Sequence, residues 1–303
     1  MSRAEPEVRP RPEESARGRS PLWTLGLFRS ELTLTFRRWR TLALLGVLAA
    51  VPVLIAIAVK TGAGDGSPSG GGGGGEGGAA GPAFLTQVTG NGLFLVFAAL
   101  AATLPVFLPM TVGVVAGDAV AGEANAGTLR YLLVAPAGRT RLLLAKFAST
   151  MVFCLVATLV VAVSAVVTGA VLFPLGDVTT ISGTRIGFGD GLLRALLIAV
   201  VVAASLVGIA AIGLFLSTLT NSGIAAMAAT VGLLITVQIV NAIPQLDALH
   251  PYLFPNHWLS FADLLREPVP WDGVIDNLRL QALYAAVFGS AAWARFTTKD
   301  ITA

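Results

Sequence analysis

The residues of this chain that could carry out chemistry are few, and their spacing matches no familiar catalytic centre. His250 and His257 are the only histidines, and a metal site would need more ligands converging at set spacings. The chain contains no Gly-x-Ser-x-Gly, no His-Glu-x-x-His and no Gly-x-x-x-x-Gly-Lys-Ser/Thr sequence. Cys154 is the single cysteine, which excludes an intramolecular disulfide. We therefore expect no catalytic residue, no metal ion and no cofactor on this chain.

Polar side chains within apolar stretches are the next candidates. Gln238 and Asn241 lie late in the apolar run 222–243. Two roles remain open for them: hydrogen bonds between helices, or contact with a transported molecule. Two opposite-charge pairs are spaced three or four residues apart, so that each can pair on a helix surface: Asp190 with Arg194, and Asp276 with Arg279.

The segment 117–146 carries the most informative pattern. Thr128 is a good helix N-cap, and three leucines follow it at helical spacing on one face: Leu129, Leu132 and Leu133. Pro136 ends this helix within about two turns. Such a short helix with an apolar face needs a surface on which to bury that face. It either docks on another protein or folds back on this chain's own amphipathic helix.

Six long apolar runs must position these residues. A mean hydropathy of +0.78, with only 12% charged residues, excludes an ordinary soluble domain. Each run approaches or exceeds the ~18 to 20 apolar residues that cross a bilayer core of about 30 Å. We expect an all-α integral membrane protein with six transmembrane helices, at 42–59, 93–115, 147–172, 192–216, 222–243 and 275–294.

The distribution of basic residues orients these spans. Fifteen of the twenty Lys and Arg residues lie on one side of the membrane once the six runs are taken as spans. By the positive-inside rule, the chain is a multi-pass cell-membrane protein with both termini and the 117–146 connection in the cytoplasm. The basic residues face anionic lipid headgroups, so the net charge of +3 gives no reason to expect a nucleic-acid partner.

The segments around the spans differ in character. Residues 1–20 have the composition of a disordered cytoplasmic tail, whereas 21–303 form the transmembrane domain. Residues 22–40 predict an amphipathic interfacial helix, although a frayed start of the first span is the alternative. The glycine-rich outer loop 61–91 predicts a flexible coil, and 244–274 predicts short helices that dip into the outer leaflet.

The 117–146 pattern resembles the one found in permease subunits of type-2 ABC exporters. Nine residues carry the resemblance: Glu123, Gly127, Thr128, Leu129, Leu132, Leu133, Pro136, Arg139 and Lys146. The order of the parts is also similar to that family across about 20–303. It comprises an interfacial helix, six spans, a cytoplasmic connection between the second and third spans, and a broken outer segment before the sixth.

The resemblance implies a type-2 ABC exporter permease architecture and ATP-driven efflux of a drug, an antibiotic or a lipid-like amphiphile. ATP and Mg would bind to two ABC ATPase subunits on separate chains, and a second copy of this permease or a related permease would complete a dimer. Contacts with the ATPase would come from Glu123, Gly127, Thr128, Leu129, Arg130, Leu132, Leu133 and Pro136. By analogy, the pathway would be lined by the second and fifth spans, which offer Phe97, Phe107, Met110, Gln238 and Asn241.

A function of another class remains open. The chain could be a non-transporting membrane scaffold or accessory protein that docks a cytoplasmic partner through the 117–146 connection. A neighbouring gene for a stand-alone ATPase would favour the exporter over the scaffold.

Overall fold

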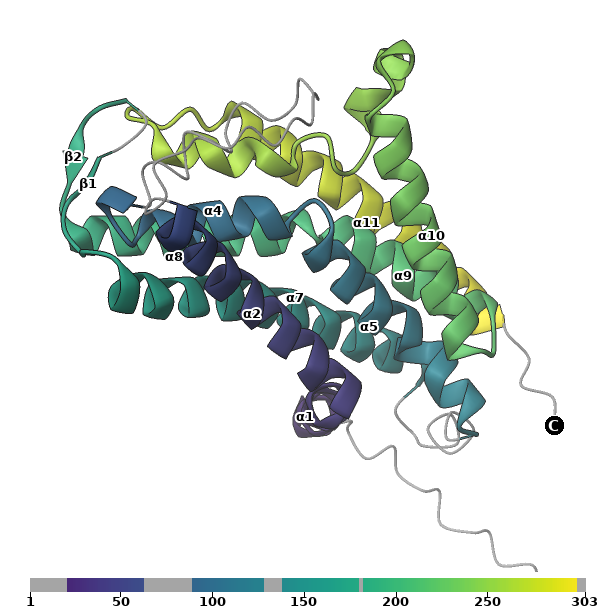
Figure 1. The fold of residues 1–303 in the computed structure, drawn as a ribbon. Helices are drawn as coiled ribbons and strands as arrows, with labels where there is room; N and C mark the ends of the chain where they lie inside the picture. The colour runs from purple at the N-terminus through teal and green to yellow at the C-terminus, as the bar shows by residue number, and fades with distance from the viewer. Residues whose placement is uncertain (1–20, 63–88, 128–137, 180–181, 299–303) are drawn as a thin grey trace, which may run out of the picture.

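The computed structural model describes residues 21–62, 89–127, 138–179 and 182–298. Apart from a short antiparallel pair of strands, β1 (Val178–Thr179) and β2 (Arg185–Ile186), the elements of these residues are helices (Figure 1). Helices suit a bilayer because each one satisfies its own backbone hydrogen bonds. Five are long and apolar enough to cross a membrane, as an all-α membrane protein requires: Trp39–Thr61, Phe107–Asn125, Arg139–Leu172, Phe188–Leu219 and Gly223–Asn241.

The N-terminal part forms two helices rather than one. Helix α1 (Pro21–Arg37) and helix α2 (Trp39–Gly62) meet at a bend at Arg38. The helix that precedes the first span is therefore separate from it, while a position of α1 at the membrane interface stays a prediction. The Phe36 ring lies 6.0 Å from the Phe153 ring, which packs the end of α1 against α7.

The second apolar run is broken into two helices. Helix α4 (Phe94–Thr103) and helix α5 (Phe107–Asn125) are separated around Pro105. A proline cannot donate a backbone hydrogen bond, and its ring disturbs the preceding turn. The carbonyl oxygen of Pro105 instead accepts a hydrogen bond from Gln238 Nε2 at 2.5 Å.

Two boundaries differ from the sequence prediction. Helix α5 continues to Asn125 and α7 begins at Arg139, so the connection is 126–138 rather than 117–146. Helix propensity and side-chain pairing extend both helices beyond the apolar runs. The last expected span, 275–294, lies within the 27-residue helix α11, which is not among the five apolar helices above. A count of six spans therefore stays a prediction.

The remaining helices follow in order along the chain. They are α7 (Arg139–Leu172), α8 (Phe188–Ser205), α9 (Val207–Leu219), α10 (Gly223–Asn241), the 3₁₀ helices η1 (Pro244–Tyr252) and η2 (Trp258–Leu265), and α11 (Asp272–Thr298). The prediction of short helices in 244–274 is confirmed by η1 and η2.

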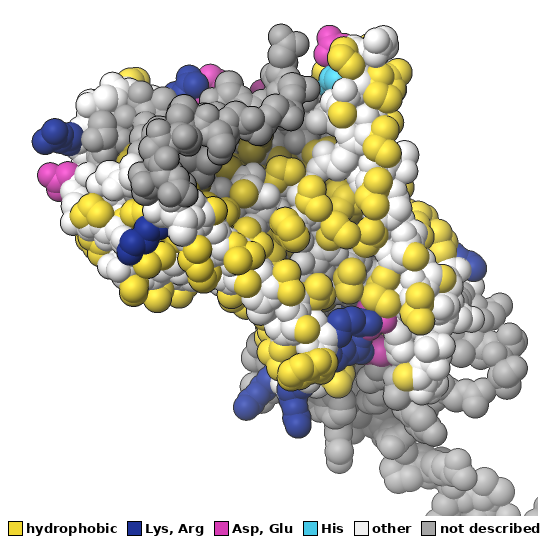
Figure 2. Space-filling view, in the orientation of Figure 1, with side chains coloured by type: hydrophobic (Ala, Val, Ile, Leu, Met, Phe, Trp, Pro, Cys, Tyr) yellow, Lys and Arg dark blue, Asp and Glu magenta, His cyan; other side chains and the backbone are white. Residues whose placement is uncertain are grey.

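Helix α5 packs against both α9 and α10, while α9 packs on α11 and α2 packs on α7. Close approach of α5 and α10 requires Gly117, where a Cβ atom would lie 3.0 Å from the Met227 backbone. Helices α2 and α10 flank α4 and α5 in Figure 1 and are the least buried of the five apolar helices. Their hydrophobic side chains cover much of the face shown in Figure 2.

Candidate functional site

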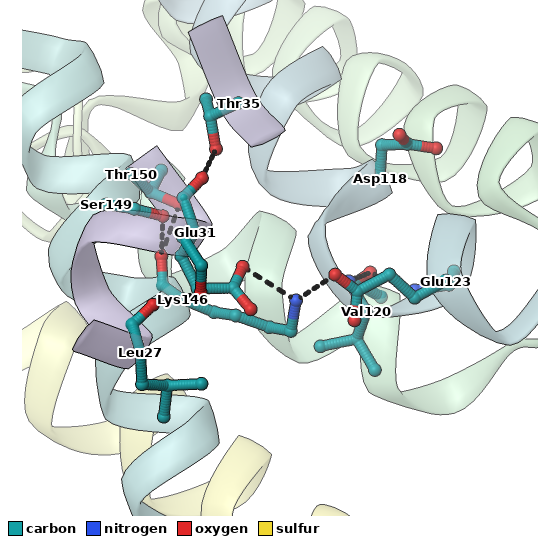
Figure 3. Close-up of polar contacts among 12 residues, drawn as sticks. Leu27, Glu31, Thr35, Asp118, Val120, Glu123, Lys146, Ser149 and Thr150 are labelled. Atoms are coloured by element: carbon teal, nitrogen blue, oxygen red, sulfur yellow. Dashed lines mark hydrogen bonds and ion pairs between the residues drawn. The ribbon is translucent and has the colours of Figure 1, made fainter. Parts of the chain in front are cut away.

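A buried lysine lies at the centre of the most unusual group of side chains. Lys146, in the third turn of α7, is 1% exposed. Its Nζ atom donates to Glu123 Oε1 at 2.5 Å and to Glu31 Oε2 at 3.0 Å, as Figure 3 shows. Both carboxylates are buried as well. One lysine therefore joins α1, α5 and α7.

A second group of ion pairs lies beside the first. Asp118, one turn and a half before Glu123 on α5, pairs with Arg40 at 2.5 Å and also with Arg38. The Asp118 side chain is 9% exposed, whereas the two arginine side chains are 37% and 40% exposed. Asp118 therefore fixes the junction between α1 and α2 to α5. We call these six residues the ion cluster: Glu31, Arg38, Arg40, Asp118, Glu123 and Lys146.

The charges of the ion cluster are formally balanced, with three cations and three carboxylates. This charge balance is important because burying one unpaired charge lowers the free energy of unfolding by roughly several kcal/mol. A buried ion pair therefore need not add to the stability of the fold, but separating its two partners is unfavourable, so it holds their helices together. Removing one member would leave an uncompensated charge.

Local backbone contacts fix the helices around the ion cluster. The Lys146 carbonyl oxygen accepts hydrogen bonds from Ser149 Oγ at 3.0 Å and Thr150 Oγ1 at 2.9 Å. On α1, Thr35 Oγ1 donates to the Glu31 carbonyl at 2.9 Å. Each of these hydroxyl groups donates its hydrogen bond to a backbone carbonyl of its own helix, and therefore needs no partner on another helix.

A small pocket opens at the ion cluster, with polar walls from α1, α2 and α7. It offers about 20 Å³ of space, enough for about one water molecule. Its polar lining includes Thr35, Arg38, Arg40, Thr41, Ser149 and Thr150. The space suits a water molecule, and the charged side chains around it join α1, α2, α5 and α7.

Of the eight predicted coupling residues, Glu123 and Gly127 lie within the described residues. Gly127 ends α5 with a positive φ of 70°, and Gly138 precedes α7 with a φ of 74°, which favours glycine at both positions. Thr128, Leu129, Arg130, Leu132, Leu133 and Pro136 lie outside the described residues.

Glu123 is buried within the chain. Its side chain is 6% exposed and its Oε1 atom accepts a hydrogen bond from Lys146 Nζ. Contact of Glu123 with an ATPase stays a prediction.

The five predicted pathway residues lie on three helices, α4, α5 and α10. Phe97, on α4, is 1% exposed, and its place in a pathway stays a prediction. Phe107 is 45% exposed at the start of α5, and Met110 is half-buried. Gln238 makes the interhelical hydrogen bond to Pro105, and Asn241 is half-buried at the end of α10. Phe107, Met110, Gln238 and Asn241 lie on α5 and α10, which contact each other.

The two histidines show local contacts. His250 Nε2 lies 3.2 Å from the Val240 carbonyl oxygen, and its Nδ1 lies 3.4 Å from Asp247. Within the described ranges, no group of three or more His, Cys, Asp or Glu side chains could hold a metal ion. Asp276 pairs with Arg279 as predicted, but Arg194 pairs with Glu267 at 3.2 Å instead of Asp190.

The fold is that of an all-α membrane protein. Ion pairs of the cluster connect its N-terminal helix α1 to α5 and α7. The chain belongs to the family described as "Protein of unknown function (DUF2705)", whose model matches residues 79–302. No curated protein matches the chain.

Proposed function

We propose that this chain is the membrane-spanning permease subunit of an ATP-driven type-2 ABC exporter that moves a drug, an antibiotic or a lipid-like amphiphile. The observation that carries the proposal is the ion cluster. It bonds α1 to the two helices that bracket the 126–138 connection, where the exporter-like motif lies. A docking segment must be tied firmly to the bundle if its movement is to reach the membrane.

The physical basis of this coupling is rigidity. The ion pair between Lys146 and Glu123 holds α5 and α7 together near the two ends of the connection. A displacement of the connection by a docked partner would therefore move α5 and α7 as one body. Helix α5 then carries the displacement to its break with α4 at Pro105, where Gln238 of α10 bonds to the chain. The break is a natural hinge because the i to i−4 hydrogen-bond ladder is interrupted there.

The proposal requires partners on other chains. Two ABC ATPase subunits would supply ATP and Mg at the cytoplasmic end, and a second permease, identical or related, would complete the pathway. Both termini would be cytoplasmic and the protein would lie in the cell membrane. Helices α5 and α10 would face the pathway, which agrees with the exposed Phe107.

Copurification tests this proposal. A tagged chain is isolated from its native membranes in mild detergent, and its partners are identified by mass spectrometry. The expected result is a stand-alone ABC ATPase whose hydrolysis rises with particular amphiphiles, while the purified chain alone binds no nucleotide. Capture of a different cytoplasmic protein, with no ATPase, would contradict the exporter and favour the scaffold.

A further inference from the structure

We infer that Arg37, Arg38 and Arg40 form a binding site for the phosphate group of an anionic phospholipid, whose acyl chains lie along the exposed face of α2. We call residues 37–41, where α1 meets α2, the elbow. The inference concerns a resident lipid and does not depend on the proposed transport activity.

The first argument is the difference in exposure within the ion cluster. The carboxylates of Glu31, Glu123 and Asp118 are 5%, 6% and 9% exposed, and all three bond to cations. The side chains of Arg38 and Arg40 are 37% and 40% exposed. Although the ion cluster is formally neutral, the charge that it presents to its surroundings is therefore positive.

The two arginines also retain hydrogen-bonding capacity. Each guanidinium has five N–H donors, and Asp118 occupies only part of each. The Nε atom of Arg40 is buried and has no hydrogen-bond partner among the described residues. A phosphate group could accept hydrogen bonds from both guanidinium groups, and arginine suits it because its planar donors match the oxygens of a phosphate.

Arg37 adds a third cation. It is exposed at the end of α1 and makes no ion pair with the described residues. Trp39 follows at 83% exposure, and tryptophan prefers the boundary between lipid headgroups and acyl chains. Figure 2 shows arginine and lysine side chains gathered at the lower end of α2, next to acidic atoms and below an apolar surface.

The apolar face of α2 argues for a lipid rather than free phosphate. Large exposed side chains continue along α2 from the elbow: Leu42, Val47, Val53, Leu54 and Ile57. Leu42 to Ile57 spans about 22 Å at a rise of about 1.5 Å per residue. Free phosphate would use only the arginines, whereas a phospholipid also covers this face.

Native mass spectrometry of the detergent-purified full chain tests the inference. The protein is mixed with equal amounts of phosphatidylglycerol and phosphatidylcholine, which differ in net charge at the headgroup. Wild type should retain phosphatidylglycerol preferentially. Arg37→Gln should weaken that retention about fivefold, the effect of one basic residue near an anionic lipid surface. Asp118 keeps both of its partners in this variant, so the fold is not disturbed.

A second variant, Arg38→Gln, removes another arginine and leaves Asp118 paired with Arg40. It should weaken retention by a similar factor, and if this variant does not fold, Arg37→Gln alone decides. Arg279→Gln is the matched control, because Arg279 is an exposed arginine elsewhere that pairs with Asp276. Equal retention of both lipids, or an equal loss in Arg279→Gln, would overturn the inference. Displacement of phosphatidylglycerol by inorganic phosphate at matched concentration would overturn it in favour of free phosphate.

Discussion

Replacing Lys146 with alanine probes the ion cluster most sharply. The substitution removes two charged hydrogen bonds, at 2.5 and 3.0 Å, and leaves Glu31 and Glu123 buried without this cation. Breaking a buried ion pair from one side costs about 3–5 kcal/mol. At about 2 °C per kcal/mol for a large domain, the melting temperature should fall by about 6–10 °C.

The assay is thermal unfolding of the detergent-purified chain, followed by tryptophan fluorescence. Lys60→Ala is the matched control, since Lys60 is exposed at the end of α2 and makes no ion pair with the described residues, and it should melt as wild type does. The triple variant Lys146→Met, Glu31→Gln and Glu123→Gln removes all three charges at similar volume. It should recover most of the loss, because neutral replacements of a buried ion group are often tolerated.

Two results would refute this reasoning. If Lys146→Ala melts within about 1 °C of wild type, water reaches the carboxylates and the site is not buried as described. If the triple variant melts as low as Lys146→Ala, the loss comes from packing rather than from orphaned charge.

Three further predictions concern other parts of the chain. Gln238→Leu frees the Pro105 carbonyl and should lower stability by about 1 kcal/mol, the typical scale of a hydrogen bond between membrane helices; an unchanged melting temperature would show that the bond is not formed. Gly169→Ala would place a Cβ against the Gly92 carbonyl and should cost about 1–3 kcal/mol, measured by the same unfolding assay. Gly232→Ala, which meets no atom within 4 Å, should stabilise α10 slightly, and an equal loss in both would refute the contact. Cysteine introduced by Ser69→Cys in a Cys154→Ala background should react with an impermeant maleimide in whole cells, whereas labelling after Ser2→Cys would invert the proposed topology.

Local signals predicted most of the helices. Apolar runs of spanning length predicted α2, α7 and α10, because such runs depend on side chains close in sequence. The break between α4 and α5 also has a local cause, since it falls at Pro105. An interfacial helix over 22–40 was expected, and the bend at Arg38 falls near its end. The start of α7 was misplaced because the membrane boundary of an apolar run is not the end of its helix.

Contacts between residues far apart in the sequence could not be predicted from local sequence patterns. Lys146 belonged to the recognised motif, but its partner Glu31 lies 115 residues away, and nothing in either neighbourhood specifies the pairing. The signal that could have suggested it is that Glu31 is the only acidic residue of α1. Arg194 was assigned to Asp190, its helical neighbour, yet the tertiary fold brings Glu267 within 3.2 Å.

The proposed docking helix gives the most direct test of the exporter assignment. Thr128 to Val134 should enter a groove on the ATPase, with its leucines supplying most of the affinity, because burying one leucine gives about 1.5–3 kcal/mol. Arg130→Ala, which changes an exposed charge worth roughly 0–1 kcal/mol, should leave the complex largely intact.

The decisive measurement compares pull-down of the ATPase with the melting temperature of the isolated chain for Leu132→Asp. The account predicts that this variant loses the ATPase and transport while melting as wild type does, because a charge then meets an apolar groove on the partner. A variant that melts much lower yet still binds the ATPase would contradict the account, since the helix would then pack on the permease itself.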